Sequence, residues 1–199
     1  MLAAPRKGET VRSTGETKVS VEIDLDGSGQ AQVDTGVAFL DHMLAQVARH
    51  GLIDLKLEAR GDLEIDFHHL VEDVGIALGH ALNLAMGGKE GVERYGSALV
   101  PMDEALAMAC LDCSGRGMLV LDPPLPAGKV GEFDSELVEE FFRALAHNAG
   151  LTLHLQVMRG KNTHHVIEAL FKAFGRALSR ATSLNPRIKG VPSTKGVLG

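Results

Sequence analysis

The sequence has no tryptophan, one tyrosine and no long run of apolar residues among its 199 positions. So few aromatic side chains argue against a surface that stacks on nucleic-acid bases or on sugars. A membrane-spanning helix needs about 20 apolar residues, and neither such a run nor the apolar core of a signal peptide is present. We therefore expect a cytoplasmic protein that does not bind a membrane.

Cysteine is also scarce, and its two copies, Cys110 and Cys113, are three residues apart. They fall in a segment with the alternation of a strand, on which residues three apart point to opposite faces. A redox pair or a thiolate metal site is therefore not expected there. The sequence predicts two buried structural cysteines instead.

The sequence has fewer basic than acidic residues, with 20 lysines and arginines and 26 aspartates and glutamates, so the net charge is −6. This balance disfavours general binding to nucleic acid or to anionic membranes. Any anionic ligand must therefore be bound by a local cluster of cations.

Apolar residues alternate or recur with helical spacing in the same order in both halves of the sequence. Residues 17–25 predict a half-buried strand, and residues 30–34 are expected to return beside it as its hairpin partner. A helix, a strand and a second helix follow, and the second half repeats this order. The pattern predicts an α+β fold of two internally duplicated ββαβα halves, with sheet packed against helices.

The same pattern sets the expected domain organisation. Residues 1–15 show no periodicity and are expected to form a flexible arm. Residues 16–185 are expected to form a single domain of two pseudo-repeats, residues 16–92 and 93–185. Residues 186–199 remain as a C-terminal tail.

One short phrase occurs twice, 96 positions apart, as His68-His69-Leu70-Val71-Glu72 and His164-His165-Val166-Ile167-Glu168. On a helix the first histidine of each copy shares a face with the glutamate, and imidazole with carboxylate one turn apart is a metal-ligand arrangement. The second histidines, His69 and His165, lie about 100° further round. A single such pair is more often a helix cap or a solvated surface. Two matching pairs favour two metal ions, each with ligands from more than one helix.

His42 lies on an otherwise apolar helical segment, where a histidine is usually a satisfied core residue. The equivalent position in the second half falls near Glu140, and both residues precede their histidine pair by a similar interval. Both side chains can bind a metal, so both are candidate ligands. Imidazole with carboxylate would suit Mn, Fe, Co or Zn.

Eight phrases follow one another along the sequence: FLDHML, ARHGLIDL, DFHHLVEDVG, ERYG, DEAL, SGR, NTHHVIEALFKAFGRAL and STKGVL. In this order they resemble the imidazoleglycerol-phosphate dehydratase family of histidine biosynthesis. The resemblance extends from about residue 12 to the C-terminus. It implies a duplicated α+β domain of the ribosomal protein S5 domain 2-like class, which assembles through metal-linked trimers into a homo-oligomer of 24 subunits.

The resemblance also implies a reaction, the dehydration of imidazole glycerol phosphate to imidazole acetol phosphate. Two Mn²⁺ ions per active site would hold the imidazole ring as imidazolate, and the expelled water would leave a diazafulvene-like intermediate. The ions would act as Lewis acids and as a template, without redox change. No second fused activity is expected.

Carried over by motif, the family's metal ligands form two shells, with each complete site shared between subunits. One shell would include His42, His68, His69 and Glu72, and the other would include Glu140, His164, His165 and Glu168. Some members of the family have histidine where this chain has Glu140. The coordination at that position therefore departs from the family pattern.

Proton transfer needs a further group, and the family's acid/base residue corresponds to Glu16, with His50 and Glu72 as alternative proton carriers. The substrate phosphate needs cations. Lys172 lies one helical turn beyond Glu168, whereas the first half has Ile76 at the matching position, as a single asymmetric ligand would require. The resemblance implies further phosphate contacts by Arg94, Arg116 and the tail residues Ser193, Thr194 and Lys195.

Two other functions fit parts of this pattern. A non-redox metallohydrolase would use the same metals and ligands to activate water, but it needs no dedicated phosphate clamp. A metal-bridged assembly protein would use the histidine phrases only to join subunits, and it leaves Glu16 without a role.

Overall fold

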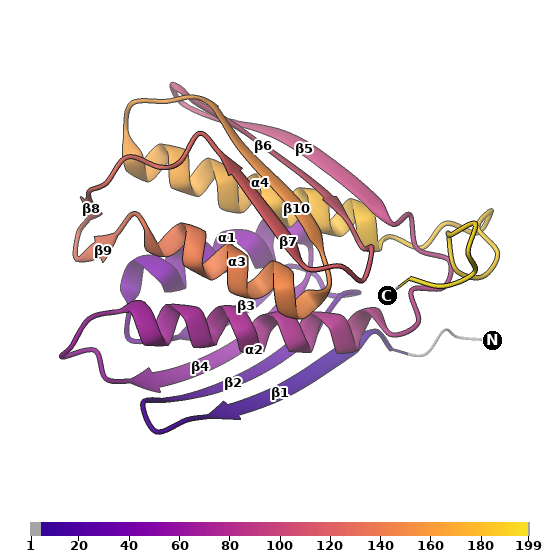
Figure 1. Cartoon of the computed structure of the whole chain (residues 1–199), viewed down its shortest axis with the longest axis horizontal. Helices are drawn as coiled ribbons and strands as arrows, with labels where there is room; N and C mark the ends of the chain where they lie inside the picture. The colour runs from indigo at the N-terminus through magenta and orange to yellow at the C-terminus, as the bar shows by residue number, and fades with distance from the viewer. Residues whose placement is uncertain (1–4, 199) are drawn as a thin grey trace.

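The computed structural model describes residues 5–198, and in this part of the chain two four-stranded sheets enclose a layer of helices (Figure 1). The first half forms β1 (Lys7–Ser13), β2 (Thr17–Asp24), β3 (Ala31–Asp34), α1 (Ala38–Gly51), β4 (Asp54–Gly61) and α2 (His68–Met86). The second half forms β5 (Tyr95–Met102), β6 (Ala105–Asp112), β7 (Met118–Asp122), β8 (Lys129–Val130), β9 (Phe133–Asp134), α3 (Leu137–Ala149), β10 (Thr152–Arg159) and α4 (Thr163–Thr182).

The two large sheets have the same topology. Their strand orders are β1-β2-β4-β3 and β5-β6-β10-β7, and in each sheet the last strand pairs in parallel while the other neighbours pair antiparallel. The predicted α+β class with helices packed on sheets is confirmed. Within the described residues, no helix is both long and apolar enough to cross a membrane.

The prediction of a flexible arm at residues 1–15 is wrong for residues 7–13, which form β1. This strand pairs along its whole length with β2. Its only fully buried residue is Gly8, where an added Cβ would lie 1.9 Å from the carbonyl oxygen of Ala81 on α2. A strand that faces the core with a glycine shows no apolar alternation, so the sequence gives no signal for it. Residues 1–4 lie outside the described part.

The expected hairpin of residues 30–34 on the first strand is also wrong. Both edges of β2 are already taken, by β1 and by β4, so β3 pairs in parallel with β4 instead. Of the two cysteines, Cys113 is buried as predicted, and burial raises the pKa of its thiol to about 12. Cys110 is exposed, contrary to the prediction, because it points to the other face of the sheet.

The helices of the two halves pack against each other in crossed pairs, α1 with α4 and α2 with α3. The α1–α4 contact is close because Gly51 and Gly175 meet there, and a Cβ on Gly175 would lie 2.7 Å from the carbonyl oxygen of Val47. Four phenylalanines of α3 and α4 fill the centre beside it, with the rings of Phe142 and Phe171 4.6 Å apart. The crossing therefore joins a first-half helix to the second histidine phrase.

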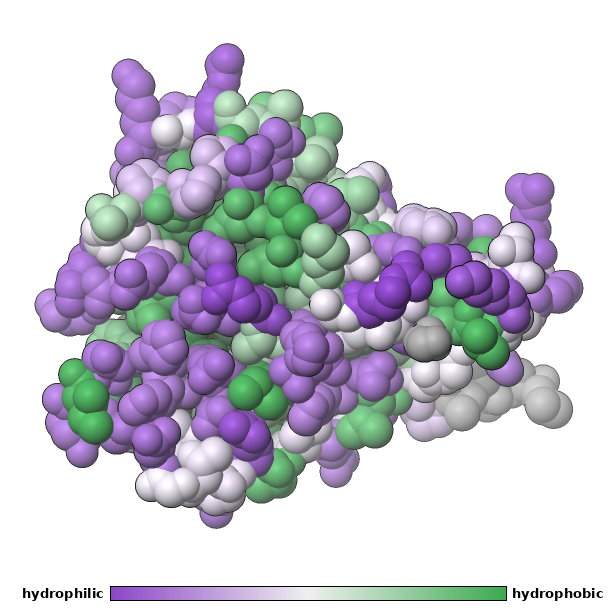
Figure 2. Space-filling model, viewed as in Figure 1, coloured by the Kyte–Doolittle hydropathy of each residue, from purple (hydrophilic) through white to green (hydrophobic). Residues whose placement is uncertain are grey.

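The outer faces of the two sheets differ in polarity. Four large exposed apolar residues lie on strands of the second sheet, against Val11 alone on the first, and these four are Tyr95, Leu99, Met118 and Met158. Figure 2 shows apolar residues gathered around the place of β7, while hydrophilic residues cover most of the lower half. The second sheet therefore exposes more large apolar side chains than the first.

Candidate metal centre and active site

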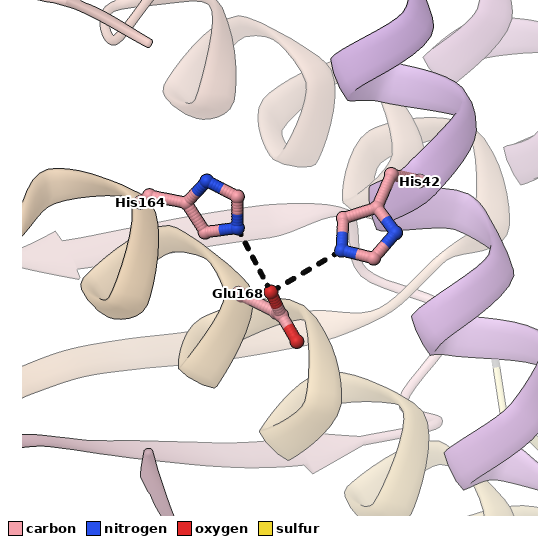
Figure 3. A group of neighbouring side chains, drawn as sticks. All are labelled: His42, His164 and Glu168. Atoms are coloured by element: carbon pink, nitrogen blue, oxygen red, sulfur yellow. Dashed lines mark hydrogen bonds and ion pairs between the residues drawn. The ribbon is translucent and has the colours of Figure 1, made fainter. Parts of the chain in front are cut away.

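Three predicted ligands meet where α1 crosses the start of α4. Nε2 of His42 and Nε2 of His164 lie 3.3 and 3.0 Å from the same oxygen of Glu168, Oε2 (Figure 3). One ligand atom from each residue can be chosen so that all three lie within 4.8 Å of one another. The arrangement is a preformed group of two imidazoles and one carboxylate that faces a common point.

The start of α4 is fixed by a helix cap. The side chain of Asn162 accepts hydrogen bonds from the backbone N–H groups of His164 and His165, so the histidine pair lies in the first turn. Glu168 follows one turn later, and its side chain is only 8% exposed. Its second oxygen, Oε1, accepts a 2.6 Å ion-pair hydrogen bond from Nζ of Lys172, one further turn along. The prediction that His164, Glu168 and Lys172 share one helix face is confirmed.

We call the group of His42, His164 and Glu168, with Lys172 beside it, the metal corner. Cations in and near this corner affect the pKa of two ionisable groups. Burial works against ionisation of Glu168, but hydrogen bonds from Lys172 and His42 outweigh it and lower the pKa of the carboxyl. Burial lowers the pKa of His50 on α1, and the nearby charges of Lys172 and Arg176 lower it further. The corner therefore holds Glu168 as a carboxylate and favours His50 in its neutral form.

A second group of three lies at the start of α2. Nδ1 of His69 is 3.0 Å from Oδ2 of Asp62 and 3.7 Å from Oε2 of Glu16. The hydrogen bond that His69 donates to Asp62 raises the pKa of His69, with a smaller contribution from the charge of Glu16. The other oxygen of Asp62, Oδ1, is buried without a hydrogen-bond partner. An unsatisfied buried carboxylate oxygen beside an imidazole is what a cation or a cation-bound water would complete.

The second half contains a related but tighter arrangement. Nδ1 of His165 is 2.8 Å from Oε2 of Glu104, whose other oxygen accepts the backbone N–H groups of Lys161 and Asn162. The hydrogen bond with His165 and these two backbone bonds lower the pKa of Glu104 to about 2. Nδ1 of His165 is thereby occupied, and its Nε2 is left for another partner.

The remaining predicted ligands are not part of a three-residue group in the described chain. His68 lies beside His69, Glu72 is exposed, and Glu140 forms a 2.6 Å ion pair with Arg143. His42 lies with second-half residues rather than with His68, His69 and Glu72, because α1 packs on α4 and not on α2. A single chain therefore brings together only part of each expected shell.

The predicted phosphate contacts are also distributed over the chain. Arg94 forms a two-pronged ion pair with Asp112 at 2.7 and 3.0 Å and donates to the carbonyl oxygen of Pro192 in the tail. Arg94 lies near Ala181, roughly 14 Å along α4 from Lys172. Arg116 is exposed in its glycine turn. Ser193, Thr194 and Lys195 form a turn at the surface, closed by hydrogen bonds to both oxygens of Ser193.

Three carboxylates near these groups are not among the site residues predicted from the sequence, namely Asp62, Asp73 and Glu104. Asp62 lies in a loop without periodicity, so nothing in the sequence links it to His69. Asp73 occupies the core face of α2, where a charged residue breaks the apolar pattern. This break in the apolar pattern could have indicated that Asp73 has polar partners, because a buried carboxylate must have them.

The donor sets fit a divalent metal. Imidazole nitrogen combined with carboxylate oxygen suits first-row ions such as Mn²⁺ and Zn²⁺. His42, His164 and Glu168 would hold one ion, and Glu16, Asp62 and His69 form the second candidate group.

Comparisons of the sequence agree with this chemistry. A family model described as Imidazoleglycerol-phosphate dehydratase matches residues 35–178. A protein of that name from Symbiobacterium thermophilum is 63% identical over 195 residues, which cover 98% of this chain and 94% of the relative. Another, from Halorhodospira halophila, is 61% identical over 196 residues, which cover 98% and 100%.

Solved structures agree as well. Imidazoleglycerol-phosphate dehydratase from Staphylococcus aureus superposes with a TM-score of 0.79 at 42% identity, covering 90% of this chain and 99% of that one. The enzyme from Pyrococcus furiosus, solved in complex with (S)-C348, gives a TM-score of 0.81 at 38% identity, covering 95% and 100%. The chain therefore belongs to the imidazoleglycerol-phosphate dehydratase family, whose members are hydro-lyases.

Proposed function

We propose that the protein dehydrates imidazole glycerol phosphate to imidazole acetol phosphate in histidine biosynthesis, with two Mn²⁺ ions per active site. The observation that supports this most directly is the convergence of His42, His164 and Glu168 beside Lys172. It combines metal ligands with a cation in one corner, as a phosphorylated, metal-bound substrate requires.

All eight predicted ligands take part in this proposal. They are His42, His68, His69, Glu72, Glu140, His164, His165 and Glu168. When bound, Mn²⁺ supplies Lewis acidity that stabilises the imidazole ring of the substrate as imidazolate. Because one chain assembles only part of each shell, the complete sites are shared between subunits, and a metal-linked oligomer of 24 subunits in the cytoplasm remains our prediction. The apolar outer face of the second sheet supports contacts between subunits.

Glu16 is proposed to carry the proton. Its side chain is 58% exposed, and its nearest charged neighbour is His69 at 3.7 Å, so it is free to approach a substrate. Glu72 is exposed as well, and His50 is favoured as a neutral base by its lowered pKa. Both remain alternative proton carriers.

Lys172 is proposed to bind the substrate phosphate. Arg94, Arg116, Ser193, Thr194 and Lys195 lie apart from Lys172 in one chain and are proposed to join it where two subunits share a site. The bond from Arg94 to Pro192 fixes the tail near this arginine, which supports a joint role for the two. The ion pair of Lys172 with Glu168 places this cation beside the metal ligands, where an anionic substrate would be drawn.

Turnover of imidazole glycerol phosphate by metal-stripped protein, before and after addition of Mn²⁺, tests the proposal. We expect the ketone product, followed by its ultraviolet absorbance, only when Mn²⁺ is present. No product from folded protein with Mn²⁺ bound would contradict the enzyme function. Metal-dependent assembly without product would instead identify a protein whose histidine phrases only join subunits.

A further inference from the structure

Asp73 is a buried carboxylate to which the proposed reaction assigns no role. Its side chain on α2 is 8% exposed and lies among apolar neighbours of the helix. Nε of Arg12 donates to Oδ1 at 2.7 Å, and the hydroxyl of Thr17 donates to Oδ2. Burying a carboxylate is unfavourable unless it is fully paired, and both partners here come from the β1–β2 hairpin. Asp73 therefore ties this hairpin to α2.

The hydrogen bonds continue from Thr17 to the backbone of Glu16. Oγ1 of Thr17 lies 3.2 Å from Oγ1 of Thr14, and because Thr17 gives its proton to Asp73, the Thr14 hydroxyl is the donor. The same Thr14 oxygen accepts the N–H groups of Glu16 at 3.2 Å and Thr17 at 3.0 Å. The turn that carries Glu16 is thus connected to α2 by an unbroken polar chain.

Glu16 and α2 must keep their relative position if Glu16 acts at the metal centre. Asp73 follows His69 by one turn of the same helix, and His69 is the group that Glu16 faces at 3.7 Å. The exposed Glu16 side chain has no hydrogen bond of its own in the described structure. Its placement therefore depends on the backbone turn. The turn is closed by the bond from the Thr14 N–H to the Thr17 carbonyl oxygen at 2.9 Å and is tied to α2 through Thr17 and Asp73.

The second half has no counterpart of this network at the equivalent positions. The two hairpins align without gaps, with Gly8 equivalent to Gly96. A Cβ added to Gly8 would lie 1.9 Å from the carbonyl oxygen of Ala81, and one added to Gly96 would lie 1.9 Å from that of Ala177. This alignment puts three apolar residues at the positions of Arg12, Thr17 and Asp73, and all three are buried, namely Val100, Ala105 and Ala169. The polar network occurs only in the half that contains Glu16.

We infer that Asp73, Thr17 and Arg12 are positioning residues that hold the Glu16 turn against α2 for proton transfer. The inference rests on the proposed function, in which Glu16 moves the proton. A general acid must be held close to its productive place, since a displacement of about 1 Å can reduce the rate about 100-fold.

The test compares Thr17→Val with Thr17→Ser in the Mn²⁺-loaded, assembled enzyme. Valine removes the hydroxyl at constant shape, and we expect kcat to fall about 10- to 100-fold while KM and the Mn²⁺ occupancy, read by electron paramagnetic resonance, stay within about twofold. Serine retains the hydroxyl and should restore kcat to within about threefold of wild type. Thr182→Val removes another buried hydroxyl, which bonds Leu178 within α4, and serves as the matched control with kcat unchanged.

Any of three results would overturn the positioning role. The first is a kcat of Thr17→Val equal to that of wild type, and the second is an equal loss of kcat in Thr17→Val and Thr17→Ser. The third is the same loss of kcat in Thr182→Val. If Thr17→Val does not fold, Arg12→Met decides, because it keeps the aliphatic stem of a half-exposed side chain. A fall in its kcat at constant KM is expected, and an unchanged kcat overturns the inference. Absence of turnover by the wild-type protein would contradict the proposed function itself, and the inference with it.

Discussion

The two copies of the histidine phrase have nearly the same letters but different surroundings. On α4, His164 and Glu168 meet His42 of another helix, and Lys172 pairs with the buried carboxylate. On α2, Glu72 is exposed and the position that corresponds to Lys172 is Ile76. The repeat therefore keeps candidate metal ligands in both halves, whereas only α4 has a lysine one turn beyond the glutamate.

The hairpins that pack on these helices also differ, but here the distinctive side chain lies in the first half. Glu16 and Glu104 occupy the same position of their β-turns, but Glu104 is held by His165 and two backbone N–H groups. Glu16 has only the 3.7 Å contact with His69. A carboxylate that is fully bonded acts as a fixed anion, and one that is free can exchange a proton. Under the proposed function, Glu16 would transfer the proton, whereas Glu104 holds His165 in place.

The largest expected effect comes from removing the proton carrier. Glu16→Gln should lower kcat by about 10²- to 10⁴-fold, the usual contribution of general acid–base catalysis, without loss of stability. Glu104→Gln should lower kcat less, because Glu104 orients His165 and does not reach the substrate. Steady-state kinetics with thermal unfolding as the control distinguish them, and equal losses in the two variants would remove the functional difference between the hairpins.

Removing the carboxylate of the metal corner should come next. Glu168→Gln should weaken Mn²⁺ binding by about 100-fold, since loss even of an outer-shell partner costs 10- to 100-fold. Isothermal titration of metal-stripped protein measures the affinity. Glu22→Gln, at an exposed glutamate of β2 that pairs with Lys56, is the matched control. Unchanged affinity in Glu168→Gln would show that the corner does not bind the ion.

The cation of the same corner should affect substrate binding. Lys172→Met should raise KM by about tenfold, because a charge-assisted hydrogen bond to phosphate contributes roughly 1.5–3 kcal/mol. Ile76→Met, at the matching position of α2, should leave KM unchanged. An equal rise in both variants would mean that the asymmetry between the helices has no role in phosphate binding.

The smallest effect concerns stability at low pH. The pKa of Glu104 is about 2 in the folded chain, below its ordinary 4.5, so its contribution to stability is complete above pH 4.5 and is lost as the pH falls toward 2. The difference in Tm between wild type and Glu104→Gln, measured on metal-stripped protein, should therefore shrink between pH 6 and pH 3. A difference that does not change over this range would contradict the assigned pKa. Glu64→Gln, at an exposed residue, should show no such trend.

The sequence predicted the parts of this site that depend on local periodicity. Lys172 and Glu168 share a face because they are one turn apart on one helix, and the structure confirms their pairing. The contact of His42 with the second histidine phrase depends on how α1 crosses α4, which no local pattern records. Asp62 was not predicted because it lies in a loop. The strand β1 was not predicted because the residue that faces the core is a glycine.

Diffraction from crystals of the Mn²⁺-loaded protein, with anomalous data collected at the manganese edge, tests the central comparison most directly. We predict two manganese peaks per subunit, one bound by Glu168 with a histidine of the α4 corner, the other within reach of the α2 phrase, with Lys172 beside the first peak only. A single peak per subunit, or none at Glu168, would contradict the account that both histidine phrases bind metal and that α4 alone supplies the cation.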